Sequence, residues 1–237
     1  MMEETALQAT LRKQNASFAP VVPFDPRSDR IAALDLSAGN SSISPEILSD
    51  TGRFTAWIRD FLETERARYA IGGYGELREL YRVSRVFNAR YPGEEPRRFH
   101  LGMDIWGKPY THVMAPLDGI VHSFGFNNNF GDYGATIILS HVLPGDLHFH
   151  SLYGHLSLNS IRNLQDGQTI LKGDVFAEFG IPVENGHWPP HLHFQIIADM
   201  QGWKGDYPGV CKFSERQIFL RNCPDPDVIL QMKRYLA

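Results

Sequence analysis

Histidine is concentrated in the middle of this chain. All ten histidines of the 237 residues lie between His100 and His193. Histidine is the commonest metal ligand among side chains and the usual proton carrier near neutral pH. Two pairs, His148/His150 and His191/His193, are spaced so that both members share one face of a strand. The middle of the chain is therefore expected to carry out the chemistry.

The segment "FHLGMDIWGKP" places a histidine and a carboxylate four residues apart, at His100 and Asp104. In a fully extended strand their α-carbons would lie roughly 13 Å apart, at about 3.3 Å per residue, too far to share one ion. Gly102 stands between them, where a bend costs least. The pattern is weak by itself, and it gains meaning only if other ligands converge on it.

Face counting separates the two histidine pairs. On a strand through "HFHSLYGH", Tyr153 and His155 fall on one face, while His148 and His150 fall on the other. If His155 points into a site, the His148/His150 pair points away from it. A bulge at Gly154 would shift this count.

The segment "HLHFQII" has a different pattern. His191, His193 and Gln195 share one face, and the opposite face is apolar, as in a strand between a core and a polar groove. A catalytic zinc takes three protein ligands and leaves a fourth position for water. Enough residues are present to build such a site and leave histidines for proton transfer: His100, Asp104, His155, His191 and His193.

Helices are expected before this region and strands within it. Residues 1–45 read as irregular, and apolar residues at helical spacing predict a helix beginning after Asp50 or Thr51 and stopping at Gly72–Gly73. "GELRELYRVSRVF" predicts a second, shorter helix. From His100 onward, short runs rich in Val, Ile, Phe and Thr alternate with turn-forming residues and predict an antiparallel sheet or sandwich. From about Gly202, the chain ends in a short tail that can be helical.

Composition limits the classes of partner and compartment. The 27 acidic and 23 basic residues nearly balance, so the positive field expected of a nucleic-acid-binding protein is missing. Cys211 and Cys223 are too few for a disulfide scaffold, and two reduced thiols are expected. No secretory leader or membrane-spanning stretch is recognised. We expect a cytoplasmic protein without a membrane or nucleic-acid partner, with export by an unconventional route as the alternative.

A family resemblance follows from the order of the motifs. "HLGMD", "APLDGIV", "GDYGATIILSH", "LYGHLS", "DGQTILKGD" and "PPHLHFQI" occur in the order and at roughly the spacing of the lysostaphin-like zinc metallopeptidases, family M23 or LytM-like peptidases. The resemblance covers about residues 98–200. It implies a mainly β protein of the lysostaphin-like type, an antiparallel sheet or sandwich, here with an N-terminal helical extension and α+β overall.

The resemblance also implies roles for individual residues. It makes His100, Asp104 and His193 the ligands of one Zn²⁺ per chain, with His155 and His191 as catalytic histidines. His191 is placed to take a proton from the zinc-bound water, and His155 to stabilise the oxyanion or protonate the leaving amine. The sequence does not decide which of the two is the base. All five positions are filled, whereas inactive relatives usually lose some of them.

Four further residues are predicted to line the substrate groove: Tyr153, His187, Trp188 and Gln195. The chain also departs from the family. Gly134–Ala135 follows the tyrosine where Gly-Asn is common, and "IPVENGHWPP" replaces the usual small-residue loop. His187 and Trp188 therefore either shape substrate recognition or only pack the loop.

Three segments and three functions follow from these patterns. Residues 1–97 are expected to form an irregular and helical extension, 98–200 the zinc peptidase domain, and 201–237 a tail packed on it. The leading hypothesis is a metalloendopeptidase that cuts stem or cross-bridge peptides of peptidoglycan. The alternatives are a cytoplasmic zinc hydrolase of another peptide or amide, and a non-catalytic LytM-like regulatory module. The N-terminal segment is a possible cover of the cleft.

Overall fold

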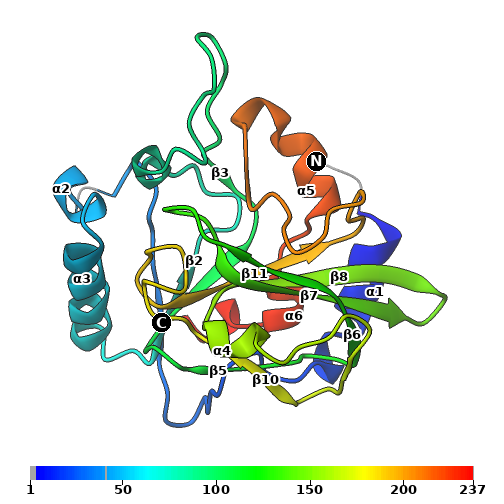
Figure 1. Cartoon of the computed structure of the whole chain (residues 1–237). Coiled ribbons are helices and arrows are strands. Elements are labelled where there is room, and N and C mark those ends of the chain that lie inside the picture. Colours follow the sequence, from blue (N-terminus) through cyan, green and yellow to red (C-terminus); the bar gives the residue numbers. More distant parts are fainter. Residues whose placement is uncertain (1–3, 41, 237) are drawn as a thin grey trace.

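The computed structural model describes residues 4–40 and 42–236, and its centre is one sheet of eight strands in the order β1-β2-β4-β11-β8-β7-β6-β9 (Figure 1). The strands of this sheet are β1 Ile31–Ala33, β2 Tyr69–Gly72, β4 Met103–Trp106, β6 Gly119–Asn127, β7 Gly134–Leu143, β8 Leu147–Leu156, β9 Thr169–Ile170 and β11 His191–Ile197. Two small sheets pair β5 His112–Met114 with β10 Val175–Glu178, and β3 Phe99–His100 with β12 Val210–Cys211. Within the described ranges, every strand pair except β1/β2 is antiparallel.

The three longest strands, β6, β7 and β8, form a meander. Their sequences are rich in β-branched and aromatic residues, which favour the pleated conformation. The β7–β8 turn falls on the turn-forming residues "LPGD", where Gly145 has φ 83° and Asp146 φ 59°. Glycine and aspartate are among the residues that tolerate this left-handed conformation. The predicted change to short antiparallel strands from His100 onward is thus confirmed.

Strand β11 lies between β4 and β8 and is completely buried. Its register places His193 opposite Asp104 of β4 on one side and opposite Gly154 of β8 on the other. This central position brings a histidine of the C-terminal half beside the carboxylate of the "HLGMD" segment.

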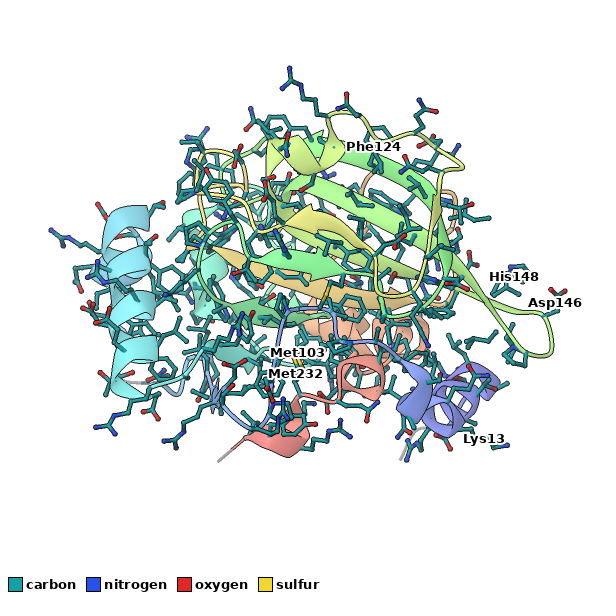
Figure 2. The ribbon with its side chains drawn as sticks, turned by 90° about the horizontal axis from the view of Figure 1, so that it is seen from below. Lys13, Met103, Phe124, Asp146, His148 and Met232 are labelled. Carbon is teal, nitrogen blue, oxygen red and sulfur yellow. The ribbon has the colours of Figure 1, made fainter. Side chains whose placement is uncertain are left out.

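Apolar residues cover both faces of the sheet. On one face Phe149, Phe194 and Ile196 pack with α1 (Ala6–Lys13) and with residues near α6 (Asp227–Leu230). Figure 2 shows Met103 of the sheet close to Met232 on this side. The opposite face carries Ile138, Leu152, Ile197 and Tyr207, with α5 (Arg216–Asn222) beside them. The remaining short helices are α2 Pro45–Leu48, α4 Leu158–Ile161 and the 3₁₀ turns Asn15–Ser17, Glu79–Val83, Phe213–Glu215 and Lys233–Tyr235.

The N-terminal helices are shorter than predicted. Helix α3 spans Thr51–Thr64, with Asp50 as its cap, and it does not continue to Gly72. Residues Tyr69–Gly72 instead form β2, because their apolar side chains are buried beside β4 and the backbone completes the sheet. The predicted second helix is reduced to the 3₁₀ turn Glu79–Val83.

The predicted fold class, a mainly antiparallel β protein with N-terminal helices, is confirmed. The three-segment division at residues 97 and 200 remains a prediction, and β1 and β2 show that residues before 97 take part in the main sheet. Both cysteines are buried and unpaired. Among the described residues, no helix has the length and apolar character needed to cross a membrane.

Candidate metal and catalytic centre

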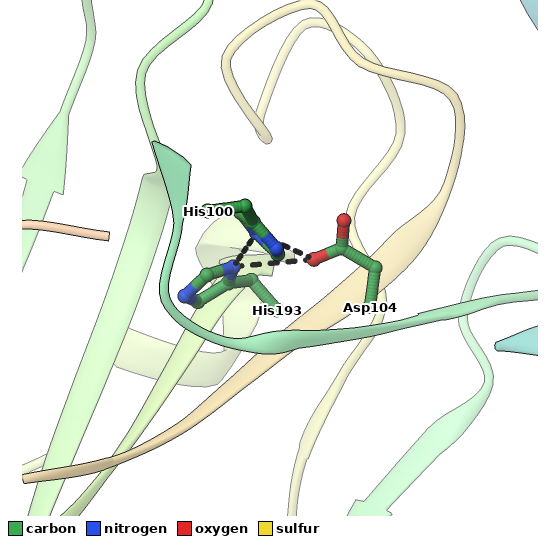
Figure 3. Close-up of side chains that lie close together, drawn as sticks. All are labelled: His100, Asp104 and His193. Atoms are coloured by element: carbon green, nitrogen blue, oxygen red, sulfur yellow. Dashed lines mark hydrogen bonds and ion pairs between the residues drawn. The ribbon is translucent and has the colours of Figure 1, made fainter. Parts of the chain in front are cut away.

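Three side chains predicted to bind a metal converge in the structure. The chain bends at Gly102 between β3 and β4, as expected, and brings His100 back toward Asp104. His100 Nε2 lies 2.9 Å from His193 Nδ1, and Asp104 Oδ1 lies 3.1 Å from that Nδ1 and 3.4 Å from His100 Nε2 (Figure 3). All three residues are buried. Two nitrogens and one oxygen thus point at a common position.

Hydrogen bonds on the far side of each ring leave the converging nitrogens free to bind a cation. His100 Nδ1 donates to the carbonyl oxygen of Gly73 at 2.9 Å, so its Nε2 carries the lone pair. His193 Nε2 lies 2.9 Å from Gln195 Oε1, and Gln195 Nε2 donates to Pro208 O, so the amide oxygen faces the ring and Nδ1 is free. A carbonyl or amide partner that fixes the tautomer is usual for metal-binding histidine. The residues therefore fit a divalent cation.

Electrostatics keep these ligands in their binding forms. Burial by itself would raise the pKa of Asp104, but His100 and the Arg78 guanidinium hold it well below its usual value. Burial, reinforced by Arg78, lowers the pKa of His100 to about 4. The carboxylate is therefore ionised and His100 neutral at neutral pH.

The two predicted catalytic histidines lie side by side next to the ligands. The ring centroids of His155 and His191 are 4.1 Å apart. His155 Nδ1 donates to Asn185 O and His191 Nδ1 donates to Pro189 O, each at 2.7 Å, so both Nε2 atoms carry a lone pair. The Trp106 ring stacks on His191 at 3.9 Å. Burial lowers the pKa of His191 to about 4 and holds that of His155 well below its usual value. Both rings can accept a proton.

A bulge in β8 sets the orientation of His155, and the predicted faces of the β8 side chains are wrong because of it. Leu156 pairs with Ala135 and Tyr153 with Ile137, so two residues of β8, Gly154 and His155, oppose a single residue of β7. His155 adopts φ 63°, in the left-handed region. Because the count shifts there, His155 and Tyr153 point to opposite faces.

Two predictions from the face counting are therefore wrong. Tyr153 does not share the face of His155, and His150 does not lie on the face opposite to the site. Tyr153 is fully buried in the core, where its hydroxyl lies 3.0 Å from Ser151 Oγ, so it does not line the groove. His150 pairs with Ile197 and lies on the same face of the sheet as His193, although several residues away along the strands. Neither His148 nor His150 joins the metal cluster.

The other predicted groove residues have different positions. Trp188 lines the cleft above the histidines. Gln195 is fully buried beneath His193, which it orients, and it does not reach the cleft. His187 is exposed, stacks on Phe130 at 5.4 Å, and lies outside this cleft.

The structure adds residues that no sequence pattern singled out. Arg78 lies against Asp104, and the Tyr133 hydroxyl, also lining the cleft, lies 3.3 Å from His193 Nε2. Arginine 26 residues before an aspartate forms no recognisable motif, so only the fold reveals this pair. The outer part of the cleft carries both charges: Arg90, Arg97, Asp132 and Asp206.

Comparisons with known proteins agree with this centre. Residues 98–204 match peptidase family M23. A Haemophilus influenzae protein described as an uncharacterized metalloprotease is 29% identical over 200 residues, which are 80% of this chain and 38% of that protein. This chain therefore spans less than half the length of that relative.

Among solved structures, lysostaphin from Staphylococcus simulans is 24% identical with a TM-score of 0.41, covering 70% of this chain and 52% of its own. A zinc-containing peptidase from Vibrio cholerae is 22% identical with a TM-score of 0.34, covering 46% of this chain and 30% of its own. Both TM-scores are below 0.5, and the similarity to peptidase family M23 rests on the sequence match of residues 98–204.

Proposed function

Residues 98–204 are a peptidase family M23 domain, and on this premise we propose that the chain is a zinc-dependent endopeptidase whose substrates are the stem or cross-bridge peptides of peptidoglycan. The observation that carries the proposal is the convergence of His100 Nε2, Asp104 Oδ1 and His193 Nδ1 next to two further histidines with free Nε2 atoms. Three protein ligands are the usual number in a catalytic zinc site, where the fourth position takes water or substrate.

The donor set favours zinc over the hard cations. Magnesium and calcium prefer oxygen ligands, whereas two imidazoles with one carboxylate suit zinc. A zinc ion bound there supplies a Lewis acid that polarises the scissile carbonyl and lowers the pKa of water toward neutrality. His100, Asp104 and His193 would hold the ion.

The protein's own groups handle the proton. His191, held by Pro189 O and by the Trp106 ring, accepts the proton of the attacking water at Nε2. Once protonated, the pair His191/His155 can return that proton to the leaving amine. The hydroxyl of Tyr133 is a further donor at the same end of the cleft.

Two features support a peptide substrate. The proposed catalytic centre lies in a cleft that Trp188 also lines, so a peptide bound there would contact this indole ring. The outer cleft offers two arginines and two aspartates, which suit a peptide carrying both carboxylates and amines. The proposal that the peptide belongs to peptidoglycan rests on these features together with the match to family M23.

Digestion of purified sacculi tests both parts of the proposal. The full chain, reconstituted with zinc, is incubated with sacculi and, separately, with a panel of unrelated peptides, and new termini are identified by mass spectrometry. Cleavage of the sacculi that stops with chelator, returns with zinc and is lost in His191→Ala is expected.

Two outcomes would contradict this expectation. Cleavage of the unrelated peptides but not of the sacculi would retain the peptidase and reject the wall substrate. Cleavage that persists after the metal is removed would reject the zinc mechanism.

A further inference from the structure

Arg78 is a buried arginine pressed against one of the metal ligands. It is 2% exposed, and its Nη1 lies 2.5 Å from Asp104 Oδ2 and 3.3 Å from the Tyr81 hydroxyl. Its Nε pairs with Glu76. A buried guanidinium is costly unless it is paired, and here Glu76 and Asp104 supply the pairing charges.

The contact occupies only one oxygen of the carboxylate. Arg78 holds Oδ2, while Oδ1 faces His193 Nδ1 at 3.1 Å and His100 Nε2 at 3.4 Å. With Oδ2 engaged, Asp104 can present a single oxygen to a cation. Groups that hold a ligand from behind fix its orientation and contribute to metal affinity.

We propose that Arg78 is a positioning residue of the metal centre, which holds Asp104 as a one-oxygen ligand and thereby strengthens metal binding. The inference rests on the metal site of the proposed function. It extends that site beyond residues 98–204, because Arg78 comes from the preceding segment.

A second contact from the same segment supports this assignment. The carbonyl of Gly73 accepts the hydrogen bond from His100 Nδ1. Gly73 has φ +105°, and a Cβ built there would lie 2.2 Å from Arg78 Nη2 and 2.8 Å from His100 Nδ1. Only glycine therefore fits between the arginine and the ligand. Residues 73–78 thus contact two of the three ligands from behind.

Metal affinity of the full-length chain tests the proposal. Zinc dissociation constants are measured by competition with a chromophoric chelator for the wild type, Arg78→Met and Arg78→Lys. We expect zinc binding about 10- to 100-fold weaker in Arg78→Met, the range typical for loss of an outer partner of a ligand. Arg78→Lys keeps the charge but not the planar guanidinium, and it is expected to restore part of the affinity.

Arg98→Met is the matched control. Arg98 is also a buried arginine, but its guanidinium bonds to Asn88 and to the carbonyls of Phe87 and Arg97 and does not contact Asp104. It is expected to bind zinc as the wild type does. The visible spectrum of the cobalt-substituted protein is expected to change in Arg78→Met and not in Arg98→Met, because only the former frees the second oxygen of Asp104.

The outcomes separate this inference from the proposed function. Wild type without stoichiometric zinc would reject the metal centre itself. Wild type with zinc, and a folded Arg78→Met of equal affinity and unchanged cobalt spectrum, would reject only the role of Arg78. Equal losses in Arg78→Met and Arg98→Met would also reject it. If Arg78→Met fails to fold, Arg78→Lys decides: weaker zinc binding supports the role and unchanged binding overturns it.

Discussion

At the scale of single residues, carbonyl oxygens decide which nitrogen of each histidine is available. The backbone carbonyl of Gly73 accepts the ring N–H of His100, and the side-chain amide oxygen of Gln195 accepts that of His193. The carbonyl of Asn185 holds His155 in the same way, and that of Pro189 holds His191. The free nitrogen is Nδ1 in His193 and Nε2 in the other three rings. The ligands and the proton acceptors are thus preorganised before any metal or substrate binds.

Removal of either proton acceptor should stop turnover without removing the metal. His155→Ala and His191→Ala are expected to lower kcat by about 10²- to 10⁴-fold, the range for general acid–base groups, because neither ring is among the three converging ligands. Zinc content by mass spectrometry and peptide hydrolysis check this. His148→Ala, an exposed histidine at the β7–β8 turn, is the control. Loss of zinc together with activity would assign the altered residue to the metal instead.

His141 should make stability depend on pH. It is 1% exposed, donates from Nδ1 to Asp118 O at 2.8 Å, and lies 2.6 Å from Ser151 Oγ through Nε2. Burial lowers its pKa to about 4, against about 6.5 in the unfolded chain. Between these values the unfolded chain binds a proton that the native chain does not, so stability falls as pH falls from about 6.5 toward 4.

The contribution of His141 can be isolated by substitution. At about 1.4 kcal/mol per pKa unit, the free energy of unfolding falls by roughly 3 kcal/mol once the pH is below the native pKa of His141. Urea unfolding at pH 7 and pH 4.5 gives the change in the free energy of unfolding with pH for the metal-free wild type and for metal-free His141→Gln. The wild type should lose about 2 kcal/mol more than the variant. Equal losses would mean that His141 titrates alike in both states.

At the scale of secondary structure, the bulge in β8 is the feature that brings His155 beside His191. It turns His155 onto the face of His193 while Tyr153 stays in the core. Gly154 lies where a Cβ would come within 2.5 Å of the Tyr133 ring. The absence of a side chain there lets Tyr133 and His155 lie together at the cleft.

Gly154→Ala should therefore lower turnover. The added methyl displaces either the Tyr133 ring or the bulge, and a displacement of about 1 Å at catalytic groups can reduce the rate about 10²-fold. Gly39→Ala, where the nearest atom would be Ser37 Oγ at 3.5 Å, is the control and should be neutral. Steady-state kinetics of both variants provide the measurement. Wild-type turnover in Gly154→Ala would show that the local packing tolerates a side chain.

The sequence was informative about elements wherever one local signal dominated. The alternation in "HLHFQII" indicated β11, and Gly102 indicated the bend that brings His100 to Asp104. Gly154 permits a bulge in β8, but a glycine in a strand does not by itself reveal whether the register shifts. The prediction that the helix continues to Gly72 is wrong because Tyr69–Gly72 forms a strand through pairing with β4, a contact distant in sequence.

At the scale of the whole molecule, the segment before residue 98 is part of the same sheet as residues 98–204. Strands β1 and β2 continue the sheet beyond β4, and apolar side chains of α3 belong to the core cluster at this end. Figure 1 shows α3 on the β2 side of the molecule. Phe54 of α3 contacts Trp106 with ring centroids 5.8 Å apart, and Trp106 in turn stacks on His191. Such long-range support cannot be read from local patterns, and for the same reason Arg78 escaped prediction.

Phe54→Ala should destabilise the whole chain. Phe54 is 2% exposed, and removal of a buried phenylalanine side chain typically costs about 3–5 kcal/mol. Urea unfolding followed by circular dichroism gives the change. Ile218→Ala, at a position 71% exposed, should remain within about 0.5 kcal/mol of the wild type. A loss below about 1 kcal/mol in Phe54→Ala would show that α3 contributes little to the fold.

The proposed hydrolysis requires a metal ion held by His100, Asp104 and His193. The most direct test is a titration of the metal-free chain with zinc, in which peptide hydrolysis is measured after each addition. We predict that activity is absent at the start, rises linearly with added zinc and stops rising at one zinc per chain. The Asp104→Ala variant should show no activity at that ratio. Full activity of the metal-free chain would contradict the account.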